Sequence, residues 1–189
     1  EKGGLGVDDP GARTRAGRRS RRPAVKEGAA LLGEVCHKFL ERWDFKKGGD
    51  PGSVLEEALA FFSQQHPLAD WGGIAKEAAE VLKAFLSSPI AAELASADIL
   101  DREAHFIMPA GHPGTSVLQV VRGSIDILYR LDGRLWVGDY KTEGRGRERK
   151  ARLYLRQGQA YVEAVRQSLG EKAGFRLFFL REAEALTLI

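Results

Sequence analysis

Cysteine is almost absent from this chain, whose 189 residues include only Cys36. One cysteine cannot form an internal disulfide, and it excludes any zinc or iron-sulfur site that needs four cysteines of the same chain. We therefore expect a reducing compartment and no iron-sulfur cluster.

Two further absences narrow the possible functions. The sequence has no apolar run near the roughly 20 residues that a membrane-spanning helix needs, and no charged stretch followed by an apolar leader. A membrane partner is therefore not expected. The sequence also lacks a Gly-x-x-x-x-Gly-Lys-Ser/Thr loop, which holds nucleotide phosphates, so this chain is not expected to hydrolyse ATP.

Arginine, by contrast, is concentrated near the start of the sequence. The formal net charge is only +3, but residues 11–22 contain six arginines and no acidic residue. Residues 1–22 are predicted to be a basic linker or tail from a longer chain; an arm resting on phosphates or on a neighbouring domain is the alternative. Residues 23–189 are predicted to form one domain, since 43% of the chain is apolar.

The spacing of apolar residues changes along the chain. It predicts helices over 24–43, from a capping box at Ser53 and Glu56 to His66, over 71–86, and after Ser88-Pro89 to 97. Three strands are predicted over 99–108, 117–130 and 134–142, then a helix over 149–170 and strands over 175–180 and 185–189. This order predicts an α/β or α+β sheet covered by helices, with a helical part first.

Asp132-Gly133 lies between two apolar strands and predicts a two-residue type I′ hairpin. In such a hairpin Asp126 and Asp139 would be cross-strand partners on one face, with Cβ atoms about 5 Å apart. Two like charges at that distance repel, and a divalent cation between them would convert the repulsion into attraction. Strand alternation places Lys141 on the same face.

This combination of groups suits phosphate chemistry. Carboxylate oxygens are ligands for magnesium, and an adjacent lysine can orient water or offset charge on a phosphate. A buried Asp-Lys ion pair is the structural alternative, but it would explain only one of the two aspartates. The opposite face was assigned to core residues, namely Ile125, Ile127, Tyr129, Trp136 and Tyr140.

Four segments together resemble one enzyme family. They are "GEVCHKFLE" at 33–41, "GSID" at 123–126, "GDYKT" at 138–142, and a Gln-x-x-x-Tyr helix motif at 157–161. Their order and spacing are similar to those of RecB-like PD-(D/E)xK nuclease domains, with aspartate in place of the usual glutamate of the second motif. The resemblance implies a restriction-endonuclease-like mixed sheet flanked by helices.

The likeness extends to the C-terminal nuclease domain of AddA and RecB helicase-nucleases. It implies a Mg²⁺-dependent exonuclease on single-stranded DNA ends that acts in end resection and double-strand break repair. The implied partners are DNA, helicase domains of the same parent chain and a second helicase-nuclease subunit, in the bacterial cytoplasm at the nucleoid. A non-catalytic DNA-binding or subunit-interaction module on the same fold is the alternative.

The resemblance also implies a metal site. Magnesium, for which manganese should substitute, would be bound by His37, Asp126, Asp139 and the carbonyl oxygen of Tyr140. His37 lies about 130° around its helix from the centre of the apolar stripe, which argues against a core role. Gly33, one turn earlier on the same side, has no side chain, which leaves room for another backbone to approach closely.

Other residues would support the reaction. By the resemblance, Lys141 activates or positions the attacking water, and Gln157 and Tyr161 line the active site and contact DNA or the lysine. Glu103 matches an acidic position that could lie in the outer shell. A second basic run over 144–156 is expected to contact the DNA backbone, with a solvated face as the alternative; its cations are Arg145, Arg147, Arg149, Lys150, Arg152 and Arg156.

Overall fold

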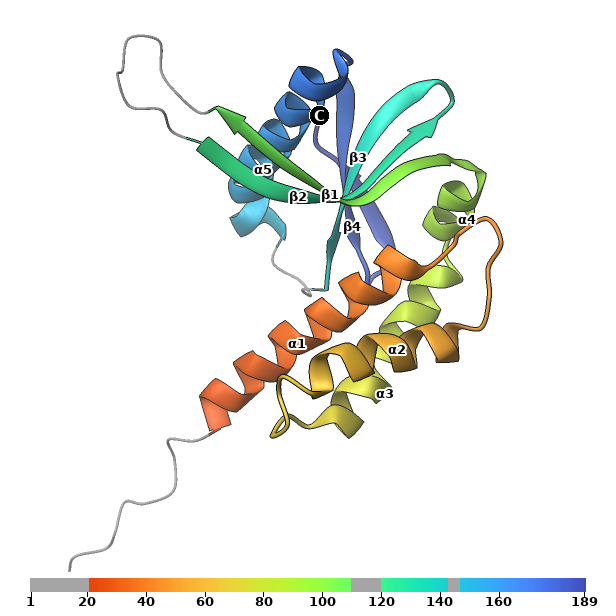
Figure 1. Ribbon diagram of the computed structural model, residues 1–189, viewed down its shortest axis with the longest axis vertical. Coiled ribbons are helices and arrows are strands. Elements are labelled where there is room, and N and C mark those ends of the chain that lie inside the picture. The colour runs from red at the N-terminus through yellow and green to blue at the C-terminus, as the bar shows by residue number, and fades with distance from the viewer. Residues whose placement is uncertain (1–20, 110–119, 143–146) are drawn as a thin grey trace, which may run out of the picture.

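The computed structural model describes residues 21–109, 120–142 and 147–189, with side chains for 27–109, 120–142 and 153–189. The elements follow in the order shown by Figure 1. They are α1 (Arg21–Arg42), α2 (Pro51–Ser63), α3 (Trp71–Leu86), α4 (Pro89–Ser96), β1 (Asp98–Pro109), β2 (Val120–Leu131), β3 (Arg134–Lys141), α5 (Arg147–Leu169), β4 (Ala173–Phe179) and β5 (Glu184–Thr187). No helix in these ranges is long and apolar enough to cross a bilayer.

The predicted start of the second helix is wrong in one respect. Asp50 caps α2, and its carboxylate accepts hydrogen bonds from the backbone N–H groups of Gly52 and Ser53. Pro51 follows it at the first helical turn, where a missing N–H costs nothing, so helix formation begins before Ser53. The predicted cap at Ser88 before α4 is confirmed, since its side chain accepts from the Ala91 N–H.

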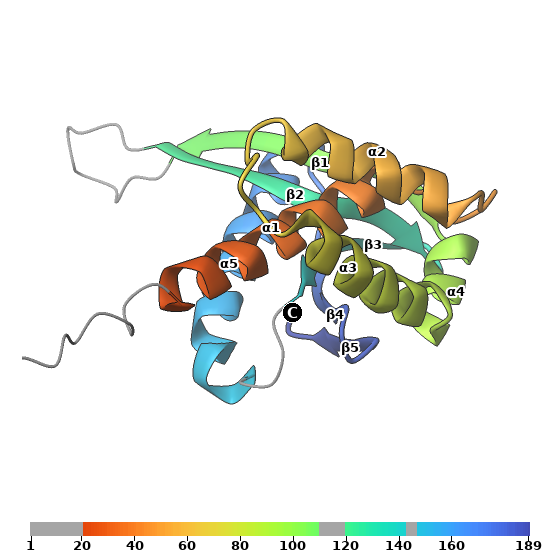
Figure 2. The same ribbon diagram turned by 90° about the horizontal axis from the view of Figure 1, so that it is seen from below.

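The strands form a mixed five-stranded sheet in the order β1-β2-β3-β4-β5. The β3–β4 pair is parallel and the other pairs are antiparallel. One core cluster joins α1, α2, α3 and α4 with Tyr140 and Phe178 of the sheet. On the opposite face, α5 packs through Tyr161 against Phe175 of β4. Figures 1 and 2 show α1, α2 and α3 grouped together, and in Figure 1 this group lies apart from α5. The predicted fold class is therefore confirmed.

The hairpin at Asp132-Gly133 is confirmed down to its register. Both residues have positive φ, 49° and 75°, as a type I′ turn requires. Pairing runs from Leu131 opposite Arg134 to Ile127 opposite Gly138. The ladder between β2 and β3 ends there, so the expected next pair, Asp126 with Asp139, is not part of it.

One core assignment is also corrected. Ile125 and Ile127 were predicted to share one face, but Ile127 packs on the α1 side and Ile125 packs on the α5 side. Simple alternation would put both on one face. The change of side coincides with the end of the β2–β3 ladder and with a positive φ of 50° at Glu103 on the neighbouring strand. The sheet is therefore irregular at Asp126.

Gly158 lets α5 lie close to the sheet. A Cβ atom built on it would be 2.1 Å from the Cδ1 atom of Phe175, in the β4 core. Gly158→Ala is expected to destabilise the protein by about 1–3 kcal/mol, because α5 must move away from a packed ring. Gly28→Ala is the matched control: its Cβ meets nothing within 4 Å, so alanine should be neutral or stabilising by up to about 1 kcal/mol.

The measurement is the free energy of unfolding of both variants by urea titration. Equal stability of Gly158→Ala and Gly28→Ala would contradict the close approach of α5. Because Gln157 adjoins Gly158, the same variant should also disturb the Gln157 contacts described below.

Candidate active site

The two aspartates lie directly beyond the end of the β2–β3 ladder. Asp126 is 8% exposed and Asp139 is 1% exposed, so both carboxylates are buried. The Asp126 Oδ2 atom accepts a 2.6 Å hydrogen bond from the backbone N–H of Tyr140. The Asp126 carboxylate of β2 thus takes the place of a β2 backbone carbonyl as the acceptor for the Tyr140 N–H of β3.

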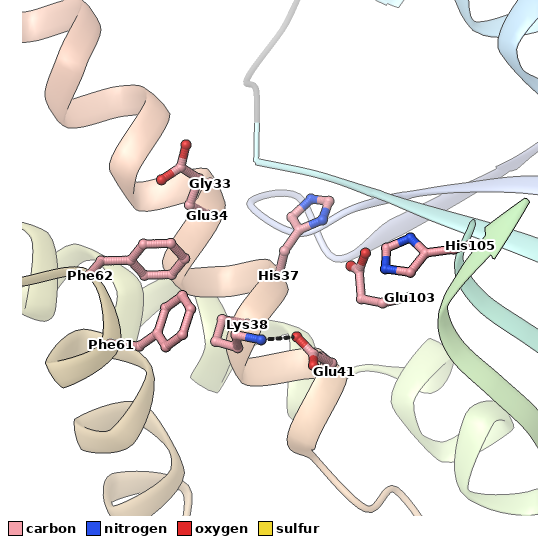
Figure 3. Close-up of a pocket in the computed structure, with 9 residues that line it drawn as sticks. All are labelled: Gly33, Glu34, His37, Lys38, Glu41, Phe61, Phe62, Glu103 and His105. Carbon is pink, nitrogen blue, oxygen red and sulfur yellow. Dashed lines mark hydrogen bonds and ion pairs between the residues drawn. The ribbon is translucent and has the colours of Figure 1, made fainter. Parts of the chain in front are cut away.

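Three possible metal ligands converge at this point. One ligand atom from each of His37, Glu103 and Asp126 lies within 4.8 Å of the other two. They come from α1, β1 and β2, and Figure 3 shows His37 and Glu103 lying side by side. His37 was predicted as a ligand, and the structure brings it to Asp126.

His37 makes two contacts that define its orientation. Its Nε2 atom lies 3.0 Å from the carbonyl oxygen of Tyr140, and its Nδ1 atom lies 3.5 Å from Asp126 Oδ2. A carbonyl can only accept, so Nε2 donates in this contact and Nδ1 is the nitrogen left to face Asp126 or a metal. The Tyr140 carbonyl, also predicted as a ligand, is therefore close to the site but engaged by His37.

Glu103 is more central than the sequence indicated. Its neighbours Arg102 and Ala104 pair with Ile127 and Ile125, which places Glu103 opposite Asp126. Its φ of 50° is costly for a residue with a side chain, by about 1–2 kcal/mol. Strain of this kind is often found at functional sites. The resemblance implies an outer-shell position for Glu103, whereas its carboxylate lies in the same group as His37 and Asp126.

A Ser124 hydroxyl holds that glutamate. Its Oγ donates a 2.8 Å hydrogen bond to Glu103 Oε2. The serine belongs to the "GSID" segment, but its partnership with Glu103 depends on the β1–β2 register, in which Ser124 pairs with His105. That register could not be predicted from the sequence, because ten residues (110–119) separate the two strands.

A second set of contacts joins Asp139, Lys141, Gln157 and Tyr161. Lys141 Nζ lies 2.6 Å from Asp139 Oδ2 and donates to Gln157 Oε1 at 3.3 Å. The Gln157 amide donates to Asp139 Oδ1 at 2.9 Å and to the Tyr161 hydroxyl at 2.7 Å. The four residues predicted from two separate motifs thus form one connected network.

Contacts from other elements fix the end of β3. The backbone N–H of Leu180 donates to the Lys141 carbonyl, and Arg181 donates to the Thr142 carbonyl at 2.7 Å. A Cβ atom on Gly33 of α1 would be 3.1 Å from the Thr142 hydroxyl. The close approach at Gly33 is therefore made by a side chain and not by a backbone as predicted, and it brings α1, with His37, against the segment that follows Lys141.

Burial and crowding change the proton affinities of the site. Burial is the main cause that raises the pKa of Asp139 to about 6, and the Asp126 carboxylate adds to it, while Lys141 and His37 act in the opposite direction. Burial acts to lower the pKa of His37, but contact with Asp126 and the charges of Asp139 and Glu103 outweigh it and raise the pKa. Without a cation, this cluster of carboxylates favours bound protons.

A divalent cation fits these residues. The buried Oδ2 atom of Asp139 has no hydrogen-bond partner besides the Lys141 ammonium among the residues that the structure describes. His37, Glu103 and Asp126 add one nitrogen and two carboxylates within reach of one ion. Oxygen-rich sets with one imidazole suit magnesium or manganese.

The comparisons with known proteins agree with this geometry. The model of the PD-(D/E)XK nuclease superfamily matches residues 12–187. The chain belongs to this superfamily. Nuclease activity, DNA as a partner and use of divalent metals are general properties of such enzymes. A search of curated proteins found no matching relative.

Most of the predicted DNA-backbone contacts lie outside the described residues. Arg145 is in the segment 143–146, and the side chains of Arg147, Arg149, Lys150 and Arg152 are likewise not described. Only Arg156 can be placed among them, and it is exposed on α5, one residue before Gln157. The expectation for this basic run therefore stays a prediction.

The raised pKa values give a prediction for metal binding. Because both shifts are upward, protons at Asp139 and His37 compete with a metal at a pH where an ordinary aspartate is already ionised. Affinity for Mg²⁺ should fall as the pH falls, by about tenfold per unit for each proton that must leave. The His37 proton competes first, below its raised pKa, and the Asp139 proton joins below about pH 6. Calorimetric titration between about pH 7.5 and about pH 5 measures this. A constant affinity over that range would mean that neither group is a ligand.

Proposed function

We propose that this superfamily member is a Mg²⁺-dependent deoxyribonuclease that hydrolyses phosphodiesters as an exonuclease on single-stranded DNA. One observation carries the proposal: the His37, Glu103 and Asp126 group adjoins the network of Asp139 and Lys141. Metal ligands and a cation for the phosphate are thus available at one point of the sheet.

In this proposal each residue has a distinct task. His37, Glu103 and Asp126 would hold the metal, together with the Asp139 oxygen that is ion-paired with Lys141. A bound Mg²⁺ supplies Lewis-acid polarisation of the phosphate and a water of lowered pKa. Asp139 and Gln157 hold the Lys141 ammonium beside the metal ligands, where it orients the attacking water and offsets charge that develops on the phosphate.

Gln157 acts through the lysine, and Tyr161 supports Gln157. The Gln157 amide bridges Asp139 and Tyr161, so it fixes the distance between the carboxylate and α5. Burial, and then the Asp139 charge, raise the pKa of Tyr161 to about 12, so its hydroxyl keeps its proton. That proton is available to a DNA phosphate, since the hydroxyl oxygen already accepts from Gln157.

The wider setting is also a proposal. The four-part likeness to AddA and RecB nuclease domains supports a helicase-nuclease that resects DNA ends in double-strand break repair. Helicase domains of the parent chain would supply the unwound strand, a second subunit would complete the enzyme, and the site of action would be the bacterial nucleoid. The basic run over 144–156 would contact the backbone of the incoming strand.

A cleavage assay tests the proposal. The chain should shorten linear single-stranded DNA with Mg²⁺ or Mn²⁺ and should be inactive with a chelator. Circular single-stranded DNA of the same composition should survive, because it has no end. Metal binding without any cleavage would instead favour a non-catalytic DNA-binding module, and cleavage of circles would show an endonuclease.

A further inference from the structure

A shallow groove leads away from the metal ligands across α1. Its volume is about 490 Å³, and His37, Glu103 and His105 line one end of it. Phe61 and Phe62 of α2 line the other end, with Lys38 and other α1 residues between them, as Figure 3 shows. A strand that places a phosphate at His37 could therefore extend along this groove to the two phenylalanines.

Phe61 is a large apolar side chain left in contact with solvent. It is 47% exposed, although it lies on the same helix as buried Ala58. Phe62 is partly buried against the core and meets the Phe61 ring edge-to-face at 4.9 Å. The exposed ring is thus supported by an anchored one.

Lys38 holds the same ring from the side of α1. Its ammonium lies 4.9 Å from the centroid of the Phe61 ring, and it is itself bound to Glu41 at 2.6 Å. A cation near an aromatic face is attractive, and here it limits the movement of the ring. Phe61 is therefore an oriented surface with little conformational freedom left to lose on binding.

The charge of the groove indicates which part of a nucleic acid would lie there. Glu34, Glu41 and Glu103 face His37, His105 and Lys38, and Lys38 is already paired with Glu41. Such a lining does not attract a run of phosphates, because binding several phosphates needs an excess of lysine and arginine. A base, which is flat and uncharged, suits the aromatic end better.

We propose that Phe61 is a stacking surface for an unpaired base of the DNA strand whose phosphate reaches the His37 group. This inference rests on the proposed nuclease function and adds a reason for a preference for single strands. Bases within a duplex are already stacked on both faces, so only an unpaired base can turn to the phenylalanine. Phe62 and Lys38 are positioning residues for that ring.

The experiment compares a strand that carries bases with a strand that has none but the same number of phosphates. Fluorescence anisotropy measures binding of an oligothymidylate and of an abasic oligonucleotide of the same length, without divalent cation. Phe61→Ala should weaken binding of oligothymidylate at least about fivefold and leave binding of the abasic strand unchanged. Phe61→Trp should bind oligothymidylate as tightly as the wild type or more tightly. Leu68→Ala, which removes an exposed apolar side chain at 99% exposure outside the groove, should change neither.

Salt dependence separates stacking from charge. The slope of log affinity against log salt should be the same for the wild type and for Phe61→Ala, because no phosphate contact is lost. Equal losses on both strands, or no loss on either, would overturn the proposal. So would an unchanged DNA affinity combined with lost binding to a protein partner, which would make Phe61 a docking residue.

A parallel assay keeps the two proposals apart. Cleavage of the same oligothymidylate by the wild-type chain with Mg²⁺ tests the nuclease function. Cleavage with no effect of Phe61→Ala on binding would reject the stacking surface alone. Absence of cleavage would reject the proposed function whatever the binding data show.

Discussion

Lys141→Ala is expected to cleave single-stranded DNA at least about a hundredfold more slowly than the wild type while still binding Mg²⁺. The substitution removes an ammonium that lies 2.6 Å from Asp139 and leaves His37, Glu103 and Asp126 in place. Loss of one group that orients water or offsets transition-state charge costs about 2.7 kcal/mol or more of barrier. Arginine should not restore the rate fully, because a guanidinium is larger and cannot act as a base.

Single-turnover cleavage of a labelled oligonucleotide at saturating Mg²⁺ measures the effect. Lys141 is one of the groups that lower the pKa of Asp139, so its removal favours protonation of that carboxyl. The assay should therefore be run at about pH 8, two units above the wild-type value, to keep Asp139 ionised. Lys172→Ala, which removes an exposed lysine after α5, is the control. Near-wild-type cleavage by Lys141→Ala would reject the catalytic role of the lysine.

Asp126→Asn is expected to have the largest effect, about a thousandfold or more on cleavage, with a parallel loss of Mg²⁺ affinity. The amide keeps the shape of the side chain and can still accept from the Tyr140 N–H, so folding should survive. It removes one carboxylate from the group with His37 and Glu103, and the metal loses a charged ligand.

The pH dependence of metal binding by Asp126→Asn shows how much of its effect is due to the lost charge. Because the Asp126 charge helps to raise the pKa of Asp139, the pH profile of residual metal binding should move to lower pH in Asp126→Asn. Asp101→Asn, an exposed carboxylate on β1, should change neither the affinity nor the profile. Full activity of Asp126→Asn at low Mg²⁺ concentration would show that this aspartate is not a metal ligand.

The hairpin shows how far local sequence rules reach. Asp132-Gly133 predicted the turn, and the turn predicted every pair of the ladder from Leu131 to Ile127. The rule fails at Asp126, where a carboxylate takes the backbone N–H of Tyr140. The two aspartates interact electrostatically, but their neighbours differ. Asp126 lies with His37 and Glu103, whereas Asp139 is ion-paired with Lys141.

Features that depend on distant segments were harder to predict. Glu103 reaches the site because of its positive φ and its position opposite Asp126, and neither follows from the residues around it. The groove to Phe61 depends on how α2 packs beside α1, which no local pattern specifies. His37 and Gln157, by contrast, were found through motifs whose spacing could be read in the sequence.

The central claim is a metal centre at the end of the β2–β3 ladder. A crystal of the chain soaked in Mn²⁺, with anomalous diffraction measured near the manganese edge, tests it most directly. The account predicts an anomalous peak at bonding distance from His37, Glu103 and Asp126, next to the carboxylate of Asp139. Manganese bound only elsewhere, or a site that stays empty under conditions in which the chain cleaves DNA, would contradict it.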